Sequence, residues 1–252
     1  MSELNKNNKI ERNGRNHDHV KAKPKQWGRS IKGENSWTLF KVMAEIVDGF
    51  ETLNRIGPCI SIFGSARTKP DQKYYKYAVE IAKKLSYEGF GVITGGGPGI
   101  MEAANKGAYL ADGVSVGLNI DLPFEQKDNP FIDPDKGLDH RYFFVRKMMF
   151  VKYAQGFVVL PGGFGTMDEL FEVLTLIQTN KIKRVPIVLF GTNFWNGLKA
   201  WMKESMFNEE KTIGPDDLEL IPTTDDVNEV VKYICGFYEG EQSDWLKPNY
   251  EL

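Results

Sequence analysis

A glycine-rich stretch followed by two carboxylates is the part of the sequence best equipped for chemistry. It reads Pro-Gly-Gly-Phe-Gly-Thr-Met-Asp-Glu over residues 161–169. The uncharged run 157–160 before it predicts a buried strand, and apolar residues at helical spacing over 170–177 predict a helix after it. Glycines at such a junction let a ligand approach the backbone, and the helix start favours an anion such as phosphate. The stretch therefore predicts a phosphate-type site with Asp168 and Glu169 beside it.

Thr166 and Glu169 also fit a second interpretation. In a capping box both side chains satisfy backbone donors at the start of a helix, which alone would explain these two residues. It does not explain three glycines in four positions, Gly162, Gly163 and Gly165. We therefore predict that these glycines and Thr166 bind the phosphate. This stretch alone leaves Glu169 open between a catalytic residue and a helix cap.

Two further glycine turns follow apolar strands earlier in the chain. Gly64 comes after the expected strand 59–63, and Gly-Gly-Gly-Pro-Gly occupies 95–99 after the expected strand 91–94. Strands alternate with helical patterns throughout, which predicts one doubly wound, Rossmann-like α/β domain with a mainly parallel sheet and helices on both faces. Ligands of such sheets bind at the carboxyl ends of the strands, so we expect all three glycine turns to build one site.

The other elements follow from hydrophobic periodicity and turn residues. The first expected helix is capped by Ser36, ends near Gly57, and has an apolar face made of Leu39, Phe40, Met43, Ile46, Val47, Phe50 and Leu53. Later helices are expected over 71–88, through 103–108, over 142–153, around 194–201, and from a cap at Thr224 or Asp225 to Phe237. Further strands are expected at 114–118, 185–190 and 218–221, with a long loop from Asn119 to about Gly137 and a loose end over 240–252.

Composition limits the classes of protein and site. A chain of 252 residues with 41% hydrophobic content suits one large α/β domain. No apolar run is long enough for a membrane helix and no signal peptide opens the sequence, so we expect a cytoplasmic protein. Cys59 and Cys235 are expected to be free thiols. With three histidines in the chain, neither a zinc site nor a Ser-His-Asp triad is expected.

Charge is unevenly distributed along the chain. Residues 1–32 contain nine basic and three acidic residues, and the remainder contains 23 basic and 31 acidic residues. We therefore expect a flexible basic tail over 1–35 ahead of the domain at 36–252. An acidic body argues against nucleic acid as a partner of the domain, and a nucleic-acid-binding protein that uses the basic tail is the alternative left open.

Two common nucleotide motifs are missing from the sequence. Neither the glycines after the first strand nor those at 95–99 have the spacing of a dinucleotide fingerprint, and no P-loop lysine followed by Ser or Thr occurs. The sequence therefore indicates neither an NAD(P) enzyme nor an ATPase, and we expect no cofactor.

Taken together, three motifs resemble the LOG (Lonely Guy) family over roughly residues 36–238. They are Gly-Gly-Gly-Pro-Gly-Ile-Met at 95–101, Arg146-Lys147, and Pro-Gly-Gly-Phe-Gly-Thr at 161–166 with Glu169. The stretch 116–126 looks like the larger bacterial subgroup. Members are cytokinin riboside 5′-monophosphate phosphoribohydrolases, and bacterial members also act as AMP nucleosidases. The resemblance implies hydrolysis of a purine nucleoside 5′-monophosphate to free base and ribose 5-phosphate, by a homo-oligomer that is a dimer or hexamer.

The resemblance also implies roles for individual residues. Glu169 would stabilise positive charge on the ribose and activate water, and Arg146 would grip the substrate or assist the leaving base. The implied substrate-binding residues are Gly96, Gly97, Gly99, Met101, Glu125, Lys147, Gly162, Gly163, Gly165, Thr166 and Thr175. Without the resemblance, Arg146 would be interpreted as a surface charge of a helix and Glu125 equally well as a solvated loop carboxylate.

An alternative function is a nucleotide-binding module without catalysis on the same fold. The pair Arg146 and Glu169 distinguishes the two, because a carrier needs the glycines but not this pair. Older annotation of similar proteins as lysine decarboxylases finds no support, since no lysine is convincingly placed for a pyridoxal Schiff base.

Overall fold

The computed structural model describes residues 34–122, 129–239 and 246–249. Contacts divide the chain into residues 1–38 and 39–252. Of the first unit, residues 34–38 are described, and they are helical. The expected basic tail lies outside the described residues up to residue 33, as does Glu125.

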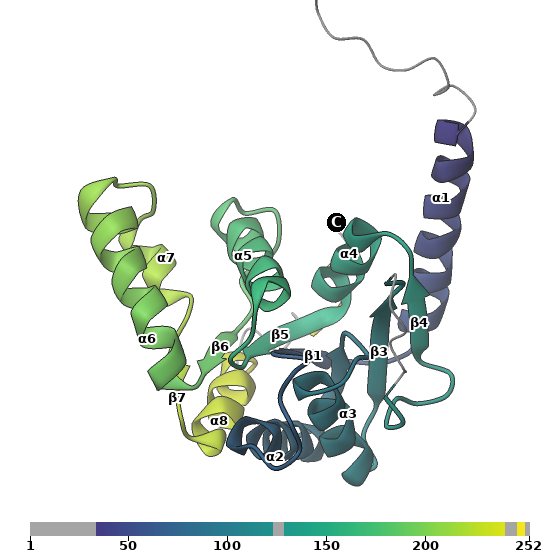
Figure 1. The fold of residues 1–252 in the computed structure, drawn as a ribbon, viewed down its shortest axis with the longest axis horizontal. Coiled ribbons are helices and arrows are strands. Elements are labelled where there is room, and N and C mark those ends of the chain that lie inside the picture. Colours follow the sequence, from purple (N-terminus) through teal and green to yellow (C-terminus); the bar gives the residue numbers. More distant parts are fainter. Residues whose placement is uncertain (1–33, 123–128, 240–245, 250–252) are drawn as a thin grey trace, which may run out of the picture. The chain divides into compact units, whose positions relative to one another are not determined.

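A seven-stranded sheet forms the centre of the second unit, in the order β4-β3-β2-β1-β5-β6-β7 (Figure 1). Every neighbouring pair is parallel, which confirms the expected doubly wound fold. The strands are β1 Cys59–Phe63, β2 Gly91–Thr94, β3 Ser115–Ile120, β4 Gly137–His140, β5 Ala154–Val159, β6 Ile187–Phe190 and β7 Thr223–Thr224. The inner strands β1, β2, β3, β5 and β6 are buried throughout, which explains why most of their residues are apolar.

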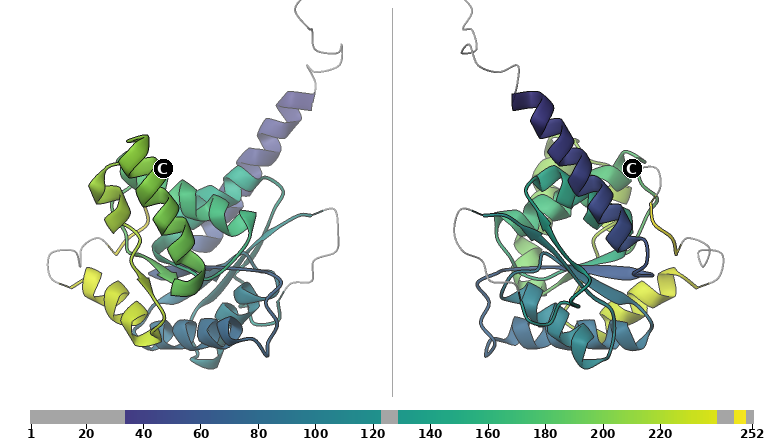
Figure 2. Two further views of the ribbon diagram at one scale, coloured as in Figure 1. Left: turned by 60° about the vertical axis from the view of Figure 1, so that its left-hand side comes forward. Right: turned by 90° about the vertical axis from the view of Figure 1, so that its right-hand side faces the viewer.

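Helices cover both faces of this sheet (Figures 1 and 2). On one face α2, α3 and α8 share a hydrophobic cluster, and on the other α4, α5 and α6 share a second cluster with the end of α1. The helices are α1 Glu34–Leu53, α2 Lys73–Tyr87, α3 Ile100–Leu110, α4 Phe143–Tyr153, α5 Phe164–Gln178, α6 Thr192–Trp201, α7 Pro215–Glu219 and α8 Val227–Phe237, with a π-helix at Met202–Glu209.

The three glycine turns meet at the carboxyl ends of β1, β2 and β5, as expected. Ser65 N–H donates to the carbonyl of Pro161 at 3.0 Å, which joins the turns after β1 and β5. The N–H of Ile100 donates to the carbonyl of Ser65 at 3.0 Å, which joins the turns after β1 and β2. Backbone contacts thus bring together segments almost 100 residues apart in the sequence.

The first helix differs from its prediction at its start and on its face. It begins at Glu34, so Ser36 lies inside it and is not its cap. Gly49 faces α4 so closely that an added Cβ would lie 2.5 Å from Cε of Met149. This contact turns Val42, Ile46 and Leu53 toward the core. Four residues of the expected apolar face are exposed, namely Leu39, Phe40, Met43 and Val47.

Two expectations at the sheet edges were wrong. The loop expected from Asn119 to about Gly137 begins inside β3, and the edge strand β4 that starts at its end was not predicted, because the alternating exposure of β4 leaves no apolar run to detect. The strand expected at 218–221 is not formed, because Pro215 occupies the first turn of α7 and the chain reaches the sheet at β7 instead.

The C-terminal region also differs from its prediction. Asp226, not Thr224 or Asp225, caps α8, and its carboxylate accepts from the N–H of Asn228 at 2.7 Å. Residues 246–249 of the expected loose end contact the core, since Gln155 Nε2 donates to the carbonyl of residue 247 at 3.0 Å.

Two further findings concern the described residues. Cys59 and Cys235 are free thiols, as expected. No helix in the described ranges is both long enough and apolar enough to cross a membrane.

Gly99 offers a test of how the turns pack. Its φ is +72°, and an added Cβ would lie 2.4 Å from the carbonyl oxygen of Ser65. Gly99→Ala should therefore lower the free energy of unfolding by about 2 kcal/mol or more. Gly197→Ala is the matched control, because it lies in α6 with open space around its Cβ position and should raise stability by about 0.5–1 kcal/mol. Chemical unfolding would measure both, and equal effects would contradict the packing described.

Candidate active site

A buried ion pair between two helices is the centre of the site. Nη2 of Arg146, on α4, lies 3.4 Å from Oε1 of Glu169, on α5, and the side chains are 13% and 7% exposed. The capping-box interpretation fails here. Gly163 is the N-cap of α5, Thr166 lies within the helix, and Glu169 contacts Arg146 rather than the helix start.

Aromatic rings of its own helix surround the guanidinium of Arg146. Its central carbon lies 5.1 Å from the ring centre of Phe143 and 5.8 Å from that of Phe150. Burial lowers the pKa of Arg146, and the charge of Glu169 opposes this. Its Nε is buried with no hydrogen-bond partner among the described residues. Arg146 therefore keeps a donor that a ligand could satisfy.

The carboxyl group of Glu169 has its pKa near neutral pH. Burial raises the pKa of Glu169 to about 7, although the positive charges of Arg146 and Lys147 act to lower it. The carboxylates Glu172 and Asp168 push it further up. A buried carboxyl with such a pKa beside a specific cation is typical of a catalytic acid or base.

Lys147 pairs with carboxylates of α5. Its amine lies 2.8 Å from Oδ1 of Asp168 and 2.8 Å from Oε2 of Glu172. Burial acts to lower the pKa of Lys147, but these two carboxylates outweigh it and raise the pKa above its ordinary value. The amine is therefore a charged partner of α5, and its contact with phosphate stays a prediction.

The start of α5 is open to a ligand. The first helical hydrogen bond runs from Met167 N–H to the carbonyl of Gly163 at 3.1 Å. The N–H groups of residues 164–166 therefore have no backbone acceptor in the described structure. Gly163 and Gly165 have open space at their Cβ positions, whereas Gly162 packs against the buried Thr166. The predicted anion position thus consists of exposed backbone donors at the positive end of a helix.

The turn after β2 contributes the opposite wall. Met101 Sδ lies 2.8 Å and Nη1 of Arg146 3.8 Å from the Cβ position of Gly95, so this turn contacts the ion pair. Gly96 has a φ of +71°, and an added Cβ would fall on the side chain of Asn119. The neighbouring Gly97 is buried.

Three further predicted binding residues have separate outcomes. Thr175 is exposed, and its hydroxyl donates to the carbonyl of Phe171 at 2.7 Å. It follows Glu169 by six residues, which is about 240° around the helix, so the two do not share a face. Lys147 is engaged by α5, and Glu125 lies outside the described residues. The structure brings together Arg146 and Glu169 with the turns that contain the remaining predicted residues.

A buried polar network beneath the turn was not predicted. Oδ1 of Asn105, on α3, accepts from Thr94 Oγ1 at 2.5 Å and from Asn129 Nδ2 at 2.8 Å. Thr94 Oγ1 in turn accepts from Gly96 N–H at 3.0 Å, and the carbonyl of Gly96 accepts from Asn129 N–H at 3.2 Å. The network thus engages both the N–H group and the carbonyl group of Gly96. Its one sequence signal is an asparagine inside an alanine-rich helix.

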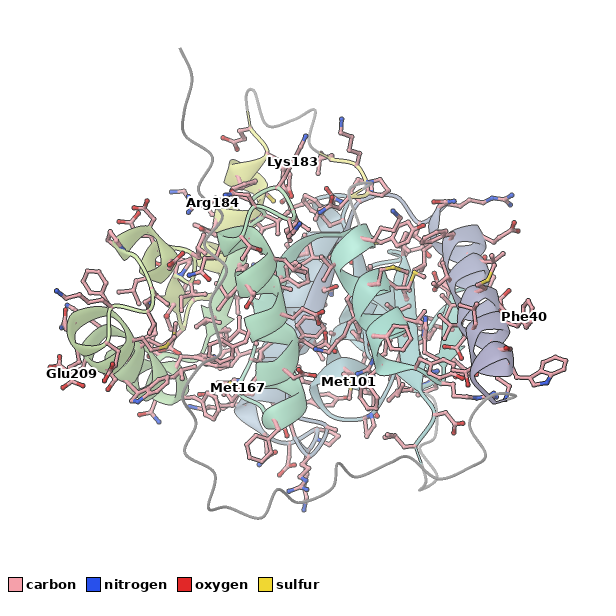
Figure 3. All side chains as sticks on the ribbon, turned by 90° about the horizontal axis from the view of Figure 1, so that it is seen from above. Phe40, Met101, Met167, Lys183, Arg184 and Glu209 are labelled. Atoms are coloured by element: carbon pink, nitrogen blue, oxygen red, sulfur yellow. The ribbon has the colours of Figure 1, made fainter. Side chains whose placement is uncertain are left out.

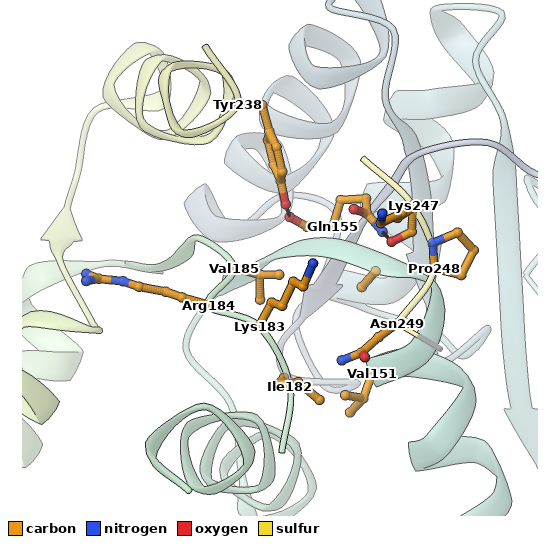
Figure 4. Close-up of a pocket in the computed structure, with 11 residues that line it drawn as sticks. Val151, Gln155, Ile182, Lys183, Arg184, Val185, Tyr238, Lys247, Pro248 and Asn249 are labelled. Carbon is orange, nitrogen blue, oxygen red and sulfur yellow. Dashed lines mark hydrogen bonds between the residues drawn. The ribbon is translucent and has the colours of Figure 1, made fainter. Parts of the chain in front are cut away.

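Two hollows lie at opposite ends of the strands. One of about 490 Å³ adjoins the glycine turns and is lined by Ser65, Thr68, Gln72, Lys73, Tyr74, Pro161, Gly162 and Phe194. The other, of about 250 Å³, lies at the start of β5, where Tyr238 donates to the carbonyl of Gln155 (Figure 4). Figure 3 shows Lys183 and Arg184, which line this second pocket, near the edge opposite Met101 and Met167. The second pocket is therefore remote from the ion pair. Among the described residues, no group of three or more His, Cys, Asp or Glu could hold a metal ion.

Comparison with known proteins identifies the family. The family model described as "Possible lysine decarboxylase" matches residues 101–234, more than half of the chain. The chain belongs to this family, the LOG family. The pyrimidine/purine nucleotide 5′-monophosphate nucleosidase of Escherichia coli K12 is 31% identical over 131 residues, which are 48% of this chain and 28% of that protein. A cytokinin riboside 5′-monophosphate phosphoribohydrolase of Arabidopsis thaliana is 34% identical over 88 residues, 34% of this chain and 40% of that protein.

The matched stretches thus span less than half of these two relatives. A cytokinin riboside 5′-monophosphate phosphoribohydrolase of Mycobacterium tuberculosis is covered more fully, at 24% identity over 62% of this chain and 82% of that protein. Among solved structures, the molybdenum cofactor carrier protein of Chlamydomonas reinhardtii matches with a TM-score of 0.54 and 21% identity, covering 73% of this chain and 99% of that one. At that identity the likeness concerns the fold alone.

Glu169→Gln should change how the stability of this LOG-family protein responds to pH. The folded-state pKa of Glu169 is about 7 against an ordinary value of 4.5, so the folded protein holds this proton more tightly than the unfolded chain. Wild type should therefore lose stability as pH rises through this window, by on the order of 3 kcal/mol, and the variant should not.

Urea unfolding at pH 5 and pH 8 would measure this difference. Glu80→Gln is the control, because the side chain of Glu80 is 53% exposed on α2 and should leave the response unchanged. A difference between Glu169→Gln and wild type that is the same at both pH values would contradict the buried, raised pKa.

Proposed function

We propose that this protein hydrolyses the N-glycosidic bond of a purine nucleoside 5′-monophosphate, AMP or an N6-substituted cytokinin nucleotide, to free base and ribose 5-phosphate. The observation that carries the proposal is the buried Arg146–Glu169 pair beside the open start of α5. The names of the relatives from Escherichia coli and Arabidopsis thaliana, a nucleotide nucleosidase and a phosphoribohydrolase, support the same reaction class.

One part of the site binds the anionic end of the substrate, and another part holds the bond that reacts. The 5′-phosphate binds the N–H groups of residues 164–166 and the turn at 96–99, where the helix dipole favours negative charge. The ribose then lies toward Glu169, whose carboxylate stabilises the positive charge that develops at C1′ as the bond to the base breaks.

Water completes the reaction. Ionised Glu169 takes a proton from water, the hydroxide oxygen bonds to C1′, and the electrons of the C1′–N bond leave with the base. The proton held by Glu169 then passes to the base, which restores the ionised carboxylate. Arg146 directs its unpaired Nε–H and remaining N–H groups at the ribose or the base. Because only ionised Glu169 accepts the proton, activity should rise with pH through about 7.

A nucleotide-binding module without catalysis remains the competing function. A carrier needs exposed backbone donors, but it has no use for a carboxyl whose burial raises its pKa to about 7. Desolvating Glu169 is unfavourable for folding, and its placement against Arg146 favours chemistry over binding alone.

Product analysis tests the proposal. Purified protein should release free base and ribose 5-phosphate from AMP or N6-isopentenyl AMP, and the other nucleoside monophosphates would rank its specificity. Glu169→Gln should lower kcat by about 10²–10⁴-fold while folding normally, because the water is no longer activated. Glu80→Gln, an exposed carboxylate on α2, should leave kcat unchanged. Tight nucleotide binding without base release would favour the binding module.

We also propose that the protein is a homo-oligomer. Exposed apolar side chains on α1 and α4 support this, with Leu39, Met43 and Val47 at 58%, 53% and 54% exposure and Phe143 and Phe144 at 49% and 59%. Such a surface is typical of a subunit interface. A cytoplasmic location stays a prediction.

Charge placed on this surface should dissociate the oligomer. Met43→Lys combined with Val47→Lys should reduce the mass measured by light scattering after size exclusion to that of one chain, because two lysines would have to be desolvated in the interface. Lys41→Ala, elsewhere on the exposed part of α1, is the control. An unchanged mass in the double variant would locate the interface elsewhere.

A further inference from the structure

The start of α4 is capped by a residue of another helix. Tyr142, the N-cap, makes no side-chain capping bond, and the first turn of α4 contains no acidic residue. Glu45 of α1 takes this place. Its carboxylate accepts from Arg141 N–H at 3.1 and 3.2 Å and from Tyr142 N–H at 3.3 Å. A carboxylate at this position satisfies backbone donors and interacts favourably with the helix dipole.

Two more contacts fix α4 along the same helix. Four residues after Glu45, Gly49 lies against the side chain of Met149. Tyr153 Oη donates at 2.9 Å to Oδ1 of Asn54, the residue directly after α1. The three contacts follow the same order along α4 and along residues 45–54. The contact made by Glu45 is at the N-terminal end of α4, just before Arg146 in the sequence.

We propose that Glu45 is a positioning residue for Arg146: by capping α4 it fixes the helix that presents the guanidinium to Glu169. The inference rests on the proposed function for its meaning in catalysis, but its structural claim stands on the contacts alone. The proposal gives α1 a role in the site, although α1 contains none of the three motifs that resemble the family.

The guanidinium depends on the placement of α4. Arg146 packs against Phe143 and Phe150 of its own helix, and it reaches Glu169 through one hydrogen bond of 3.4 Å. The turn after β2 also lies beside the guanidinium, but Glu169 is the residue that receives its hydrogen bond, so the placement of α4 sets the geometry of this pair. A shift of α4 should change the Arg146–Glu169 distance directly.

The charges around both groups determine what such a shift would do. Near the cap, His140 is 2% exposed, and burial lowers its pKa while Glu45 and Asp139 oppose this and Arg146 adds to it. Glu169 faces Arg146 and Lys147 from α4, and Asp168 and Glu172 from its own helix. Arg146 acts to lower the pKa of Glu169, so a more distant Arg146 lets that pKa rise.

The test compares Glu45→Ala with Glu45→Gln, using Glu51→Ala as the control from an exposed position of α1. The direct readout is the ¹³C NMR titration of the Glu169 carboxyl, assigned by its loss in Glu169→Gln. Glu45→Ala should raise the midpoint by about half a unit or more. It should also lower kcat/KM at pH 7 by about tenfold, because Arg146 is displaced. Glu45→Gln keeps an acceptor oxygen and should retain both properties, as should Glu51→Ala.

A milder variant covers the case in which Glu45→Ala does not fold. Glu45→Asp keeps the charge but withdraws the carboxylate from the N–H groups, so it should shift the midpoint in the same direction by less. An unchanged midpoint in folded Glu45→Ala or Glu45→Asp would overturn the proposal. So would equal impairment by Glu45→Gln and Glu45→Ala. Failure of wild type to release any base would instead reject the proposed function, and the NMR titration would still decide the role of Glu45.

Discussion

The desolvation of Glu169 against Arg146 is the interaction on which this account depends. A buried ion pair contributes little to stability, because the loss of hydration offsets most of the attraction. What the burial does change is the pKa of Glu169, which rises to about 7 even with a cation beside it. The fold therefore maintains a carboxyl group that can lose or gain a proton under ordinary conditions.

The surrounding architecture supplies what that carboxyl would need. The open start of α5 offers backbone donors and a positive dipole end, and the turn after β2 lies against Arg146. The two glycine turns are held close by backbone hydrogen bonds through the turn after β1. An anion and a sugar could thus be bound by fixed backbone groups, while two side chains from different helices meet at the reacting bond.

Much of the fold could be predicted from sequence because strand and helix patterns alternate along the chain. The elements that were missed depend on tertiary contacts. Strand β4 has mixed exposure at the sheet edge. Pro215 begins the helix α7 in the region where the apolar residues at 218–221 predicted a strand. The inward face of α1 is set by the close contact of Gly49 with Met149, which periodicity does not reveal.

The site was predictable only where a motif carried it. Arg146, Glu169 and the glycine turns come together in the structure, at distances that no sequence motif specifies. Thr175 lies on a different face of α5 from Glu169, and Lys147 pairs with carboxylates of that helix, so the binding roles of both residues stay predictions. Asn105 and Glu45 were not found, because each acts through backbone groups that only folding brings within reach.

Hydrolysis in ¹⁸O-labelled water would test the central claim most directly. If Glu169 activates water for attack at C1′, mass analysis of the products from AMP should find one ¹⁸O in ribose 5-phosphate, at C1, and none in adenine or in inorganic phosphate. Label in inorganic phosphate would mean that the phosphate ester is cleaved instead. That result would contradict the assignment of Arg146 and Glu169 to the glycosidic bond.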